Sequence, residues 1–236
     1  DVASLLTHIP HLTSLGCYSF VGKALQYIID NINPSFVSQL QYLHDTGTMM
    51  CTMNAICSTC PHLKHLYIDS PQSNTLARLT TLRDLQRLKI YRFKCDEIAP
   101  VVKCIGSQFC HLTLMKGHGI MDVTLLIQHC PNLIDLDFYM MDELTCMRSS
   151  GAGEEKFKQL HSLEILNSQM SSSTLRHLIC NCHQTIRRLA VDIVPFTDEE
   201  MARWGWRLNC KMLSLDIIIS DTKTIFICFS SIPSLA

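Results

Sequence analysis

Two cysteines and two histidines near residue 60 have types and spacing that could bind a metal ion or carry redox chemistry. Cys57 and Cys60 form a C-x-x-C pair, and His62 and His65 follow closely. Zinc requires four such ligands to converge on one tetrahedral point. Cys57 is expected on a helix and His65 is expected to point outward from a strand, so the four side chains should not converge. A redox dithiol would need a thioredoxin-like βαβ setting, which this segment does not predict.

Other signatures of catalysis are incomplete or missing in the sequence. Gly22-Lys23 resembles part of a phosphate-binding loop, but Gly16 lies one residue too far away and Ala24 replaces the Ser or Thr that binds magnesium. The sequence contains no G-x-S-x-G and no H-E-x-x-H. Several of the 11 histidines fall where strands should begin, namely His11, His62, His111 and His161. We therefore predict no catalytic residues, no cofactor and no metal site; an enzyme that uses a Cys–His pair is kept as an alternative.

The composition favours a globular protein without a strong charge bias. Twenty Lys and Arg residues nearly balance 21 Asp and Glu residues, and the formal net charge is -1. This balance argues against binding to nucleic acid or to a membrane surface through bulk charge. No apolar run approaches the roughly 18 residues that a membrane-spanning helix needs. The 13 cysteines are an odd number and no signal peptide is visible, so we expect a reduced protein of the cytoplasm or nucleus.

A short apolar pattern recurs along the chain and predicts its architecture. The pattern L-x-x-L-x-[apolar], with Leu, Ile, Met or Phe as anchors, has nine copies whose first anchors lie 22 to 30 residues apart, 25 on average. These first anchors are Leu12, Leu40, Leu63, Leu85, Phe109, Leu133, Leu163, Ile186 and Met212. The period is typical of leucine-rich repeats, in which a strand buries its anchors only against neighbouring repeats. We predict one α/β leucine-rich-repeat solenoid over residues 1–236, with about nine degenerate repeats, a curved parallel sheet on the concave side and helices on the convex side.

Helices are expected between these strands, and some segments depart from the repeat. Residues 122–129 and 173–180 have helical patterns, and Thr197 with Glu200 forms a capping box ahead of a third helix. Residues 142–158 are predicted to be an inserted loop that explains the longest step, either a mobile surface loop or one that closes over a ligand. Many leucine-rich repeats have Asn or Cys eight residues after the first anchor, but the residues at that position here include Pro71, Phe93, Met141, Val194 and Ser220.

Both tryptophans lie together, in the segment Arg203-Trp204-Gly205-Trp206-Arg207. This segment predicts either a convex-side helix that buries the rings or an exposed aromatic and arginine anchor for a partner. Neither end of the sequence has the polar cap that terminal repeats normally carry. We therefore expect the sequence to be a fragment of a longer protein that is poorly soluble by itself.

The residues that end two predicted helices resemble those of a known family. Cys60-Pro61-His62-Leu63 and Cys130-Pro131-Asn132-Leu133 share the pattern C-P-x-L, and Ile9-Pro10-His11-Leu12 and Ile232-Pro233-Ser234-Leu235 are variants of it. The pattern resembles the cysteine-containing leucine-rich repeats of F-box/LRR proteins, the substrate receptors of SCF-type (Skp1–cullin–F-box) ubiquitin ligases. The position three residues before the first anchor holds cysteine in some repeats and mostly aliphatic residues in others. This pattern predicts that the cysteine is a small, buried hydrophobic residue. No F-box precedes the first repeat, so a Skp1-type adaptor is a predicted partner only if an F-box lies outside this chain.

Alternation along each predicted strand places the third, fifth and seventh residues of the pattern on the concave side of the sheet. The predicted partner-binding residues on this side are His65, Tyr67, Asp69, Arg87, Lys89, Tyr91, His111, Asp135, Asp137, Tyr139, Asn167 and Arg188. The same rule places Ile165 and Gln169 beside Asn167. A sheet of eight such steps would be about 40 Å long, which suits a protein segment better than a small metabolite.

The sequence therefore predicts a protein-interaction module that binds a protein on its concave face. The resemblance implies substrate recognition in a ubiquitin ligase, with the ubiquitin chemistry carried out by other subunits. The alternative is a leucine-rich-repeat scaffold or signalling adaptor without a role in ubiquitin transfer.

Overall fold

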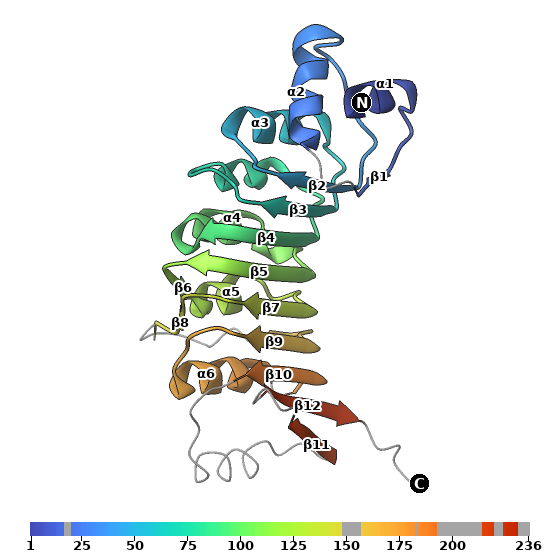
Figure 1. Cartoon of the computed structure of the whole chain (residues 1–236). Coiled ribbons are helices and arrows are strands. Elements are labelled where there is room, and N and C mark those ends of the chain that lie inside the picture. The colour runs from blue at the N-terminus through green and yellow to red at the C-terminus, as the bar shows by residue number, and fades with distance from the viewer. Residues whose placement is uncertain (17–19, 148–156, 183, 193–213, 220–223, 231–236) are drawn as a thin grey trace.

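A long sheet dominates the fold, and nearly every strand in it lies beside the preceding strand of the same sheet (Figure 1). The computed structural model describes residues 1–16, 20–147, 157–182, 184–192, 214–219 and 224–230. The sheet has the order β1-β2-β3-β4-β5-β7-β9-β10-β12-β11. The strands from β1 to β10 in this order pair in parallel, whereas β12 pairs antiparallel with both β10 and β11. The chain is thus an α/β protein with a mostly parallel sheet.

The bounds of these strands are β1 (Ser14–Leu15), β2 (Tyr42–Thr46), β3 (His65–Asp69), β4 (Arg87–Lys94), β5 (His111–His118), β7 (Asp135–Tyr139), β9 (Ser162–Leu166), β10 (Arg188–Asp192), β11 (Ser214–Ile219) and β12 (Thr224–Ser230). The α-helices are α1 (Val2–His8), α2 (Val21–Asn31), α3 (Met50–Thr59), α4 (Ile98–Ile105), α5 (Val123–His129) and α6 (Ser172–Cys182). Short 3-10 helices are η1 (Leu76–Thr81), η2 (Cys95–Glu97) and η3 (Gly106–Gln108). The connecting helices lie on one face of the sheet (Figure 1). Within the described residues, no helix combines the length and apolar character needed to span a lipid bilayer.

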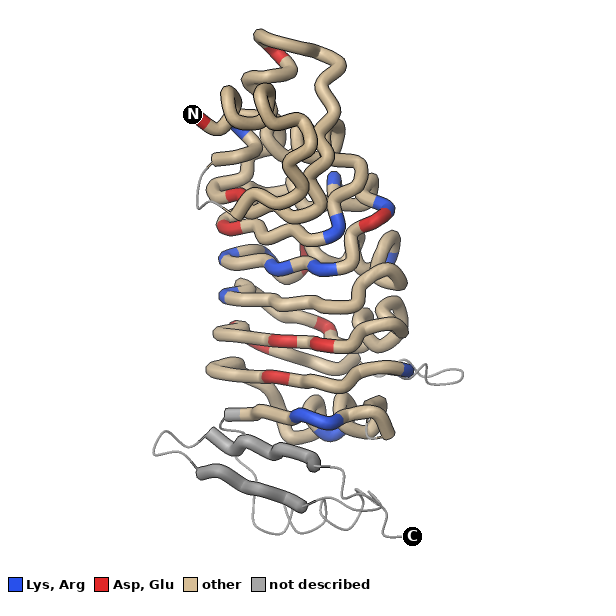
Figure 2. Tube along the Cα trace, turned by 90° about the vertical axis from the view of Figure 1, so that its right-hand side faces the viewer, with Lys and Arg blue, Asp and Glu red and all other residues tan. Residues whose placement is uncertain are grey.

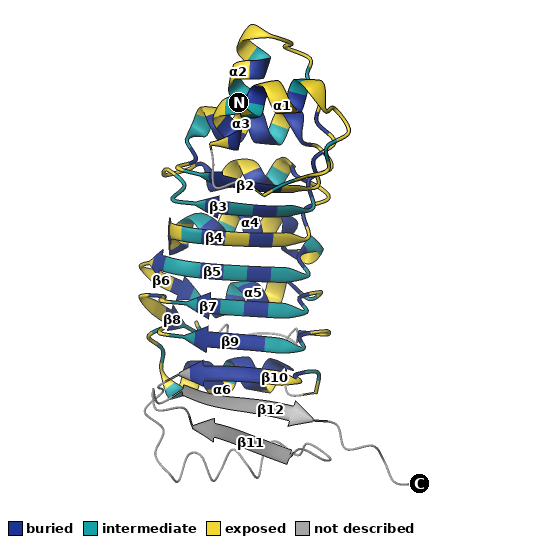
Figure 3. Cartoon of the chain, turned by 45° about the vertical axis from the view of Figure 1, so that its right-hand side comes forward, coloured by how far each residue is buried: buried dark blue, intermediate teal, exposed yellow. Residues whose placement is uncertain are grey.

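The strands pair in a register that stacks equivalent residues of successive repeats. From β2 to β10, one column contains a leucine on every strand, and all of these leucines are buried: Leu43, Leu66, Leu88, Leu112, Leu136, Leu163 and Leu189. Strands β3, β4, β5 and β7 alternate between buried side chains that face the helices and more exposed side chains on the other face (Figure 3). A strand with only one apolar face needs helices on that face to exclude water, and the connecting helices supply this cover.

One predicted register is wrong, and the pairing of β9 with β7 corrects it. Asp135 pairs with Ser162 and Phe138 pairs with Ile165, so Leu160, not Leu163, is the first anchor of this repeat. Ile165 is only 1% exposed and belongs to the core. The prediction failed because Leu160, Leu163 and Leu166 are spaced three apart, which lets the pattern start at either of the first two residues. A strand places alternate residues on opposite faces, and the wrong start therefore assigned the wrong residues to the outer face.

The C-P-x-L segments end their helices with the same backbone geometry. Cys60 ends α3 with φ -118° and ψ 63°, and Cys130 ends α5 with φ -121° and ψ 60°. Ile9 ends α1 in nearly the same conformation. Both cysteines are fully buried, which confirms the prediction that this slot holds a small hydrophobe. Leu63 N–H donates to the Cys60 carbonyl at 3.2 Å, so the proline-containing turn leads directly into the next anchor.

Two of the three predicted helices are confirmed. Residues 122–129 correspond to α5, where the side chain of Asp122 caps the helix by accepting a hydrogen bond from Thr124 N–H. Residues 173–180 fall within α6. The third helix, after Thr197, lies outside the described residues, as do both tryptophans. Part of the predicted loop 142–158 forms β8 (Glu143–Thr145), which pairs with β6 (Ile120–Asp122), and residues 148–156 of that loop lie outside the described residues.

The backbone turns through the left-handed region at the same point of six successive repeats. The residues that follow the fifth strand residue have positive φ angles between 51° and 62°, and they are Gly47, Ser70, Arg92, Lys116, Met140 and Asn167. At three of these positions the N–H donates to a carbonyl of the next repeat, at 2.8 to 2.9 Å. These main-chain bonds satisfy backbone groups in a fold that lacks the usual Asn or Cys of the turn. Phe93 and Met141, which lie eight residues after the first anchors Leu85 and Leu133, are buried.

Candidate binding groove

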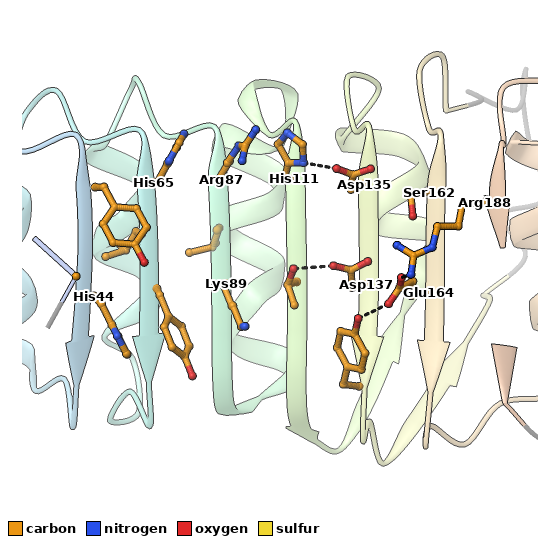
Figure 4. Close-up of a pocket in the computed structure, with 17 residues that line it drawn as sticks. His44, His65, Arg87, Lys89, His111, Asp135, Asp137, Ser162, Glu164 and Arg188 are labelled. Atoms are coloured by element: carbon orange, nitrogen blue, oxygen red, sulfur yellow. Dashed lines mark hydrogen bonds and ion pairs between the residues drawn. The ribbon is translucent and has the colours of Figure 1, made fainter. Parts of the chain in front are cut away.

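A groove of about 840 Å³ runs across the sheet on the face opposite the helices. Nine of the twelve predicted partner-binding residues line it (Figure 4): His65, Tyr67, Arg87, Lys89, His111, Asp135, Asp137, Tyr139 and Arg188. They come from five strands, β3, β4, β5, β7 and β10, and meet because the strands pair in register. The alternation of side chains along each strand thus places polar residues from distant parts of the chain in one groove.

Three predicted residues are not part of the groove lining. Asp69 lies at the end of β3, where Arg92 Nε donates to Asp69 Oδ1 at 3.0 Å and Arg92 Nη2 donates to both carboxylate oxygens. Tyr91 packs against two cations, with Lys116 Nζ 5.1 Å from its ring centroid and Arg92 Cζ 5.0 Å from it. Asn167 follows the end of β9 and has φ 51°, so its predicted place within the strand is wrong.

Aromatic rings occupy the N-terminal end of the groove, on β2 and β3. The His44 and Tyr67 rings stack with their centroids 4.0 Å apart, and Lys89 Nζ lies 5.1 Å from the centre of the Tyr67 ring. Tyr42 meets His65 edge to face, with centroids 6.3 Å apart. Burial lowers the pKa of His44, which favours its neutral form. This end of the groove therefore presents flat, amphipathic surfaces of the kind that protein interfaces favour.

The pKa of His65 is also lowered, because the ring is partly buried and lies near Arg87 and other basic side chains. Arg87 and Lys89 extend from β4 next to it and are exposed. The two cations form a basic row along β4, and Figure 2 marks the Lys and Arg positions of the chain in blue. A neutral His65 leaves Arg87 and Lys89 as the cations of this part of the groove.

Acidic side chains occupy the other half of the groove. Asp135 Oδ2 lies 2.5 Å from His111 Nδ1, and Thr113 Oγ1 donates to Asp137 Oδ2 at 2.9 Å. Burial, with smaller effects of Glu164 and Asp135, raises the pKa of Asp137 to about 6. Three neighbouring carboxyl groups thus give this half an excess of negative charge that a cation could relieve.

Glu164 and Arg188 complete the acidic half, and the sequence analysis did not include Glu164. Arg188 Nη2 lies 2.5 Å from Glu164 Oε1, and the Tyr139 hydroxyl donates to Glu164 Oε2. Burial and the hydrogen bond to Glu164 raise the pKa of Tyr139. Glu164 was missed because the β9 register was wrong; its position between Leu163 and Ile165 would have identified it in the correct register. Tyr42, His44 and Ser162 also line the groove and were not predicted as binding residues.

The groove also contains a histidine, a carboxylate and a serine in one row, but their order does not suit nucleophilic catalysis. His111, Asp135 and Ser162 occupy equivalent positions on β5, β7 and β9 (Figure 4). A catalytic triad needs the imidazole between the carboxylate and the hydroxyl, whereas the carboxylate lies in the middle here. What this arrangement can do is bind charged and polar groups along its length.

The two cysteines and two histidines near residue 60 lie apart in the structure. Cys57 lies on α3 and its Sγ is 3.5 Å from the Arg78 carbonyl, whereas His65 faces the groove. His62 pairs with Asp84 on the surface. Burial raises the pKa of the Cys60 thiol to about 11, which favours the protonated form. Across the described ranges of the chain, no three His, Cys, Asp or Glu side chains are grouped so that they could hold a metal ion.

No protein-family model matches the chain, and the search of curated proteins found no similar sequence.

Proposed function

We propose that this chain is a leucine-rich-repeat solenoid that binds another protein on the concave face of its sheet. We further propose that it is the substrate-recognition region of an SCF-type ubiquitin ligase receptor of the cytoplasm or nucleus. Several features support the solenoid. In the parallel part of the sheet, successive strands lie side by side and equivalent leucines stack in one column. The left-handed turn recurs at the same point of six successive repeats.

The observation that carries the binding proposal is the groove itself. It combines stacked aromatic rings, a basic row and an acidic half over strands β2 to β10. A groove that crosses many strands at about 4.8 Å each offers more length than a small metabolite can contact. Its acidic half, with Asp135, Asp137 and Glu164, would repel the phosphates of a nucleic acid. Both features favour a protein partner.

The ubiquitin part of the proposal is supported by the C-P-x-L segments that resemble F-box/LRR proteins. Cys60 and Cys130 have matching backbone angles, the same buried environment and the same turn into the next anchor. These shared features indicate one repeat subtype along the chain. A scaffold or signalling adaptor without ubiquitin function would have the same groove, and the presence of a Skp1-type adaptor in the complex would distinguish the two.

The test is an affinity isolation of the full-length protein that contains this chain, combined with crosslinking. Wild type is compared with Tyr67→Ala and Arg87→Glu in the groove and with Lys103→Glu, which is exposed on α4 and faces away from the groove. We expect a protein that crosslinks to the groove and is lost from both groove variants but kept by Lys103→Glu. A Skp1-type adaptor should remain in all four complexes, because it would bind outside the groove.

The outcomes separate the alternatives. If a partner depends on the groove and no Skp1-type adaptor is found, the ligase proposal is wrong and the scaffold alternative stands. If all captured proteins remain bound to both groove variants, the binding proposal itself is wrong. Loss of binding after alkylation of the thiols, with groove variants unaffected, would instead favour the Cys–His enzyme.

A further inference from the structure

The charges of the groove are arranged in a fixed order along the sheet. Arg87 and Lys89 are on β4, Asp135 and Asp137 are on β7, and only β5 lies between these two strands (Figure 4). The residue of β5 between Lys89 and Asp137 is the uncharged Thr113. A partner that lies across the strands therefore meets two opposite charges, one at each end of a short neutral gap.

The basic side chains are available to a partner. Both Arg87 and Lys89 are exposed, and neither takes part in an ion pair within the described part of the chain. Lys89 lies over the Tyr67 ring, which holds its ammonium group near the floor of the groove. An acidic side chain bound here would pair with charges that the protein itself leaves uncompensated.

The acidic side chains also have capacity for a ligand. Thr113 donates one hydrogen bond to Asp137, and His111 contacts Asp135 through a single ring nitrogen. Each carboxylate has two oxygens that can accept several hydrogen bonds, and a guanidinium can bind such a pair of oxygens with two parallel N–H groups. A basic side chain bound between Asp135 and Asp137 would also reduce their mutual repulsion.

The distance between the basic side chains of β4 and the acidic side chains of β7 favours one conformation of a bound partner segment. Two strand steps of about 4.8 Å separate β4 from β7 by roughly 10 Å. In a polyproline II helix, residues i and i+3 lie on the same side about 9.3 Å apart, whereas residues i and i+2 lie on different sides. An extended β-strand brings residues i and i+2 to one side only about 6.8 Å apart. The separation of the rows thus fits the i, i+3 spacing of an extended polyproline II segment.

We propose that the groove binds an extended segment of a partner protein that carries one acidic and one basic side chain three residues apart. The acidic side chain pairs with Arg87 and Lys89, and the basic side chain lies between Asp135 and Asp137. This inference rests on the proposed function, in which the same face binds a protein, and it adds the chemistry of the bound segment.

The test uses proline-rich fluorescent peptides and measures their binding to the whole chain by fluorescence anisotropy. One pair of peptides contains Asp-Pro-Pro-Arg or the reverse order, Arg-Pro-Pro-Asp, which covers both chain directions. We expect one of the two to bind. Replacing its Asp by Asn, replacing its Arg by Gln, or shortening the spacing to one proline should each weaken binding by roughly twofold to fivefold, the effect of losing one well-placed exposed ion pair.

Charge reversal in the protein provides the decisive comparison. The double variant Arg87→Glu with Lys89→Glu should lose the Asp-containing peptide and gain a peptide with Arg at both positions. Lys103→Glu on α4 is the matched control, since it changes charge on the opposite side of the molecule, and it should bind like wild type. Both groove positions are exposed, so the variants should keep the thermal unfolding temperature of wild type.

Failure of this inference is distinguishable from failure of the proposed function. If no peptide binds, or if binding is insensitive to spacing and to charge reversal, the inference is overturned. The proposed function then still stands, provided that a partner protein is lost from the Tyr67→Ala and Arg87→Glu variants. If the peptides behave as expected but no captured protein depends on the groove, the inference about peptide recognition holds and the proposed binding of a partner protein fails.

Discussion

Asp137 has two other carboxyl groups as neighbours, Asp135 on the same strand and Glu164 on β9. His111 pairs with Asp135, the Tyr139 hydroxyl binds Glu164, and Arg188 supplies the nearest positive charge. Burial is the largest cause of the raised pKa of Asp137, which is about 6 against the usual 3.8. The groove residue that is best placed to bind a cation is therefore also one whose ionisation the folded protein resists.

This environment predicts how the stability of the chain changes with pH. Between pH 3.8 and about 6 the folded state holds a proton on Asp137 that the unfolded state has lost. The contribution of this group to the free energy of unfolding should therefore fall as pH rises through that range and stay low above it. Asp137→Asn cannot ionise, so the stability of wild type minus that of the variant should decrease from about pH 4 to about pH 7. Urea unfolding at several pH values measures this difference, and an increase with pH would contradict the assigned environment.

Among the elements, the close contact between η3 and the end of α5 depends on a glycine. A Cβ atom on Gly106 would lie 2.8 Å from the His129 carbonyl oxygen and 2.9 Å from Cys130 Sγ. The carbonyl belongs to the backbone at the end of a helix, so it has little freedom to move away. The C-P-x-L turn of one repeat thus requires a small residue in the repeat before it.

Gly106→Ala tests this contact, because the sign of the change in the free energy of unfolding shows whether the helix end can move. Gly106 has helical angles, φ -57° and ψ -32°, where alanine alone would stabilise the fold by about 0.5–1 kcal/mol. Overpacking against a rigid neighbour costs about 1–3 kcal/mol and should dominate, so we expect a net loss in the free energy of unfolding. Gly16→Ala is the control, because its nearest neighbour, Tyr42 Cε1, is at an ordinary contact distance of 3.5 Å. Denaturant unfolding of both variants measures the difference; a stabilised Gly106→Ala protein would mean that the helix end moves freely.

The left-handed turns after the strands are an element-level feature that the sequence does not reveal. Five of the six residues at these positions are not glycine, and they include Arg92, Lys116 and Met140. Each such residue costs roughly 1–2 kcal/mol relative to the right-handed region. Glycine and asparagine mark a turn in the sequence at Gly47 and Asn167, but arginine, lysine and methionine do not. The neighbouring strands impose the turn, because the N–H groups of Ser70 and Met140 bond to carbonyls of the following repeat.

Across the whole molecule, the proposed solenoid predicts that damage to the core spreads only to neighbouring repeats. Phe138 on β7 is fully buried among strands that each contact only the strands beside them. Phe138→Ala should reduce stability by about 3–5 kcal/mol. In a repeat array the loss should raise amide hydrogen exchange mainly in β5, β7 and β9, and much less in β2 and β3. Mass spectrometry of exchanged peptides would measure this, and an equal increase in all strands would show a single cooperative globule.

Sequence and structure agree best where one residue type repeats at a fixed spacing. Buried leucines and the helix-ending cysteines were predicted at the correct positions because their burial depends on local alternation and on a repeat of about 25 residues. Nine of the twelve predicted face residues line the groove for the same reason. The prediction of Asn167 failed where leucines three apart allowed two registers, and only the pairing of β9 with β7 distinguishes them.

The amino-acid sequence alone determined the α/β class and, in the parallel part of the sheet apart from β9, the strand positions and the buried face. These follow from the period-two alternation of side chains within a strand and from its recurrence along the chain. The tertiary structure alone decided which charges meet. Glu164 joins Arg188 and Tyr139 although they are 24 and 25 residues away in the chain, and the carboxyls of Asp135 and Asp137 face His111 and Thr113 across one strand boundary. Such contacts depend on strand register, a property of two paired segments that neither segment specifies by itself.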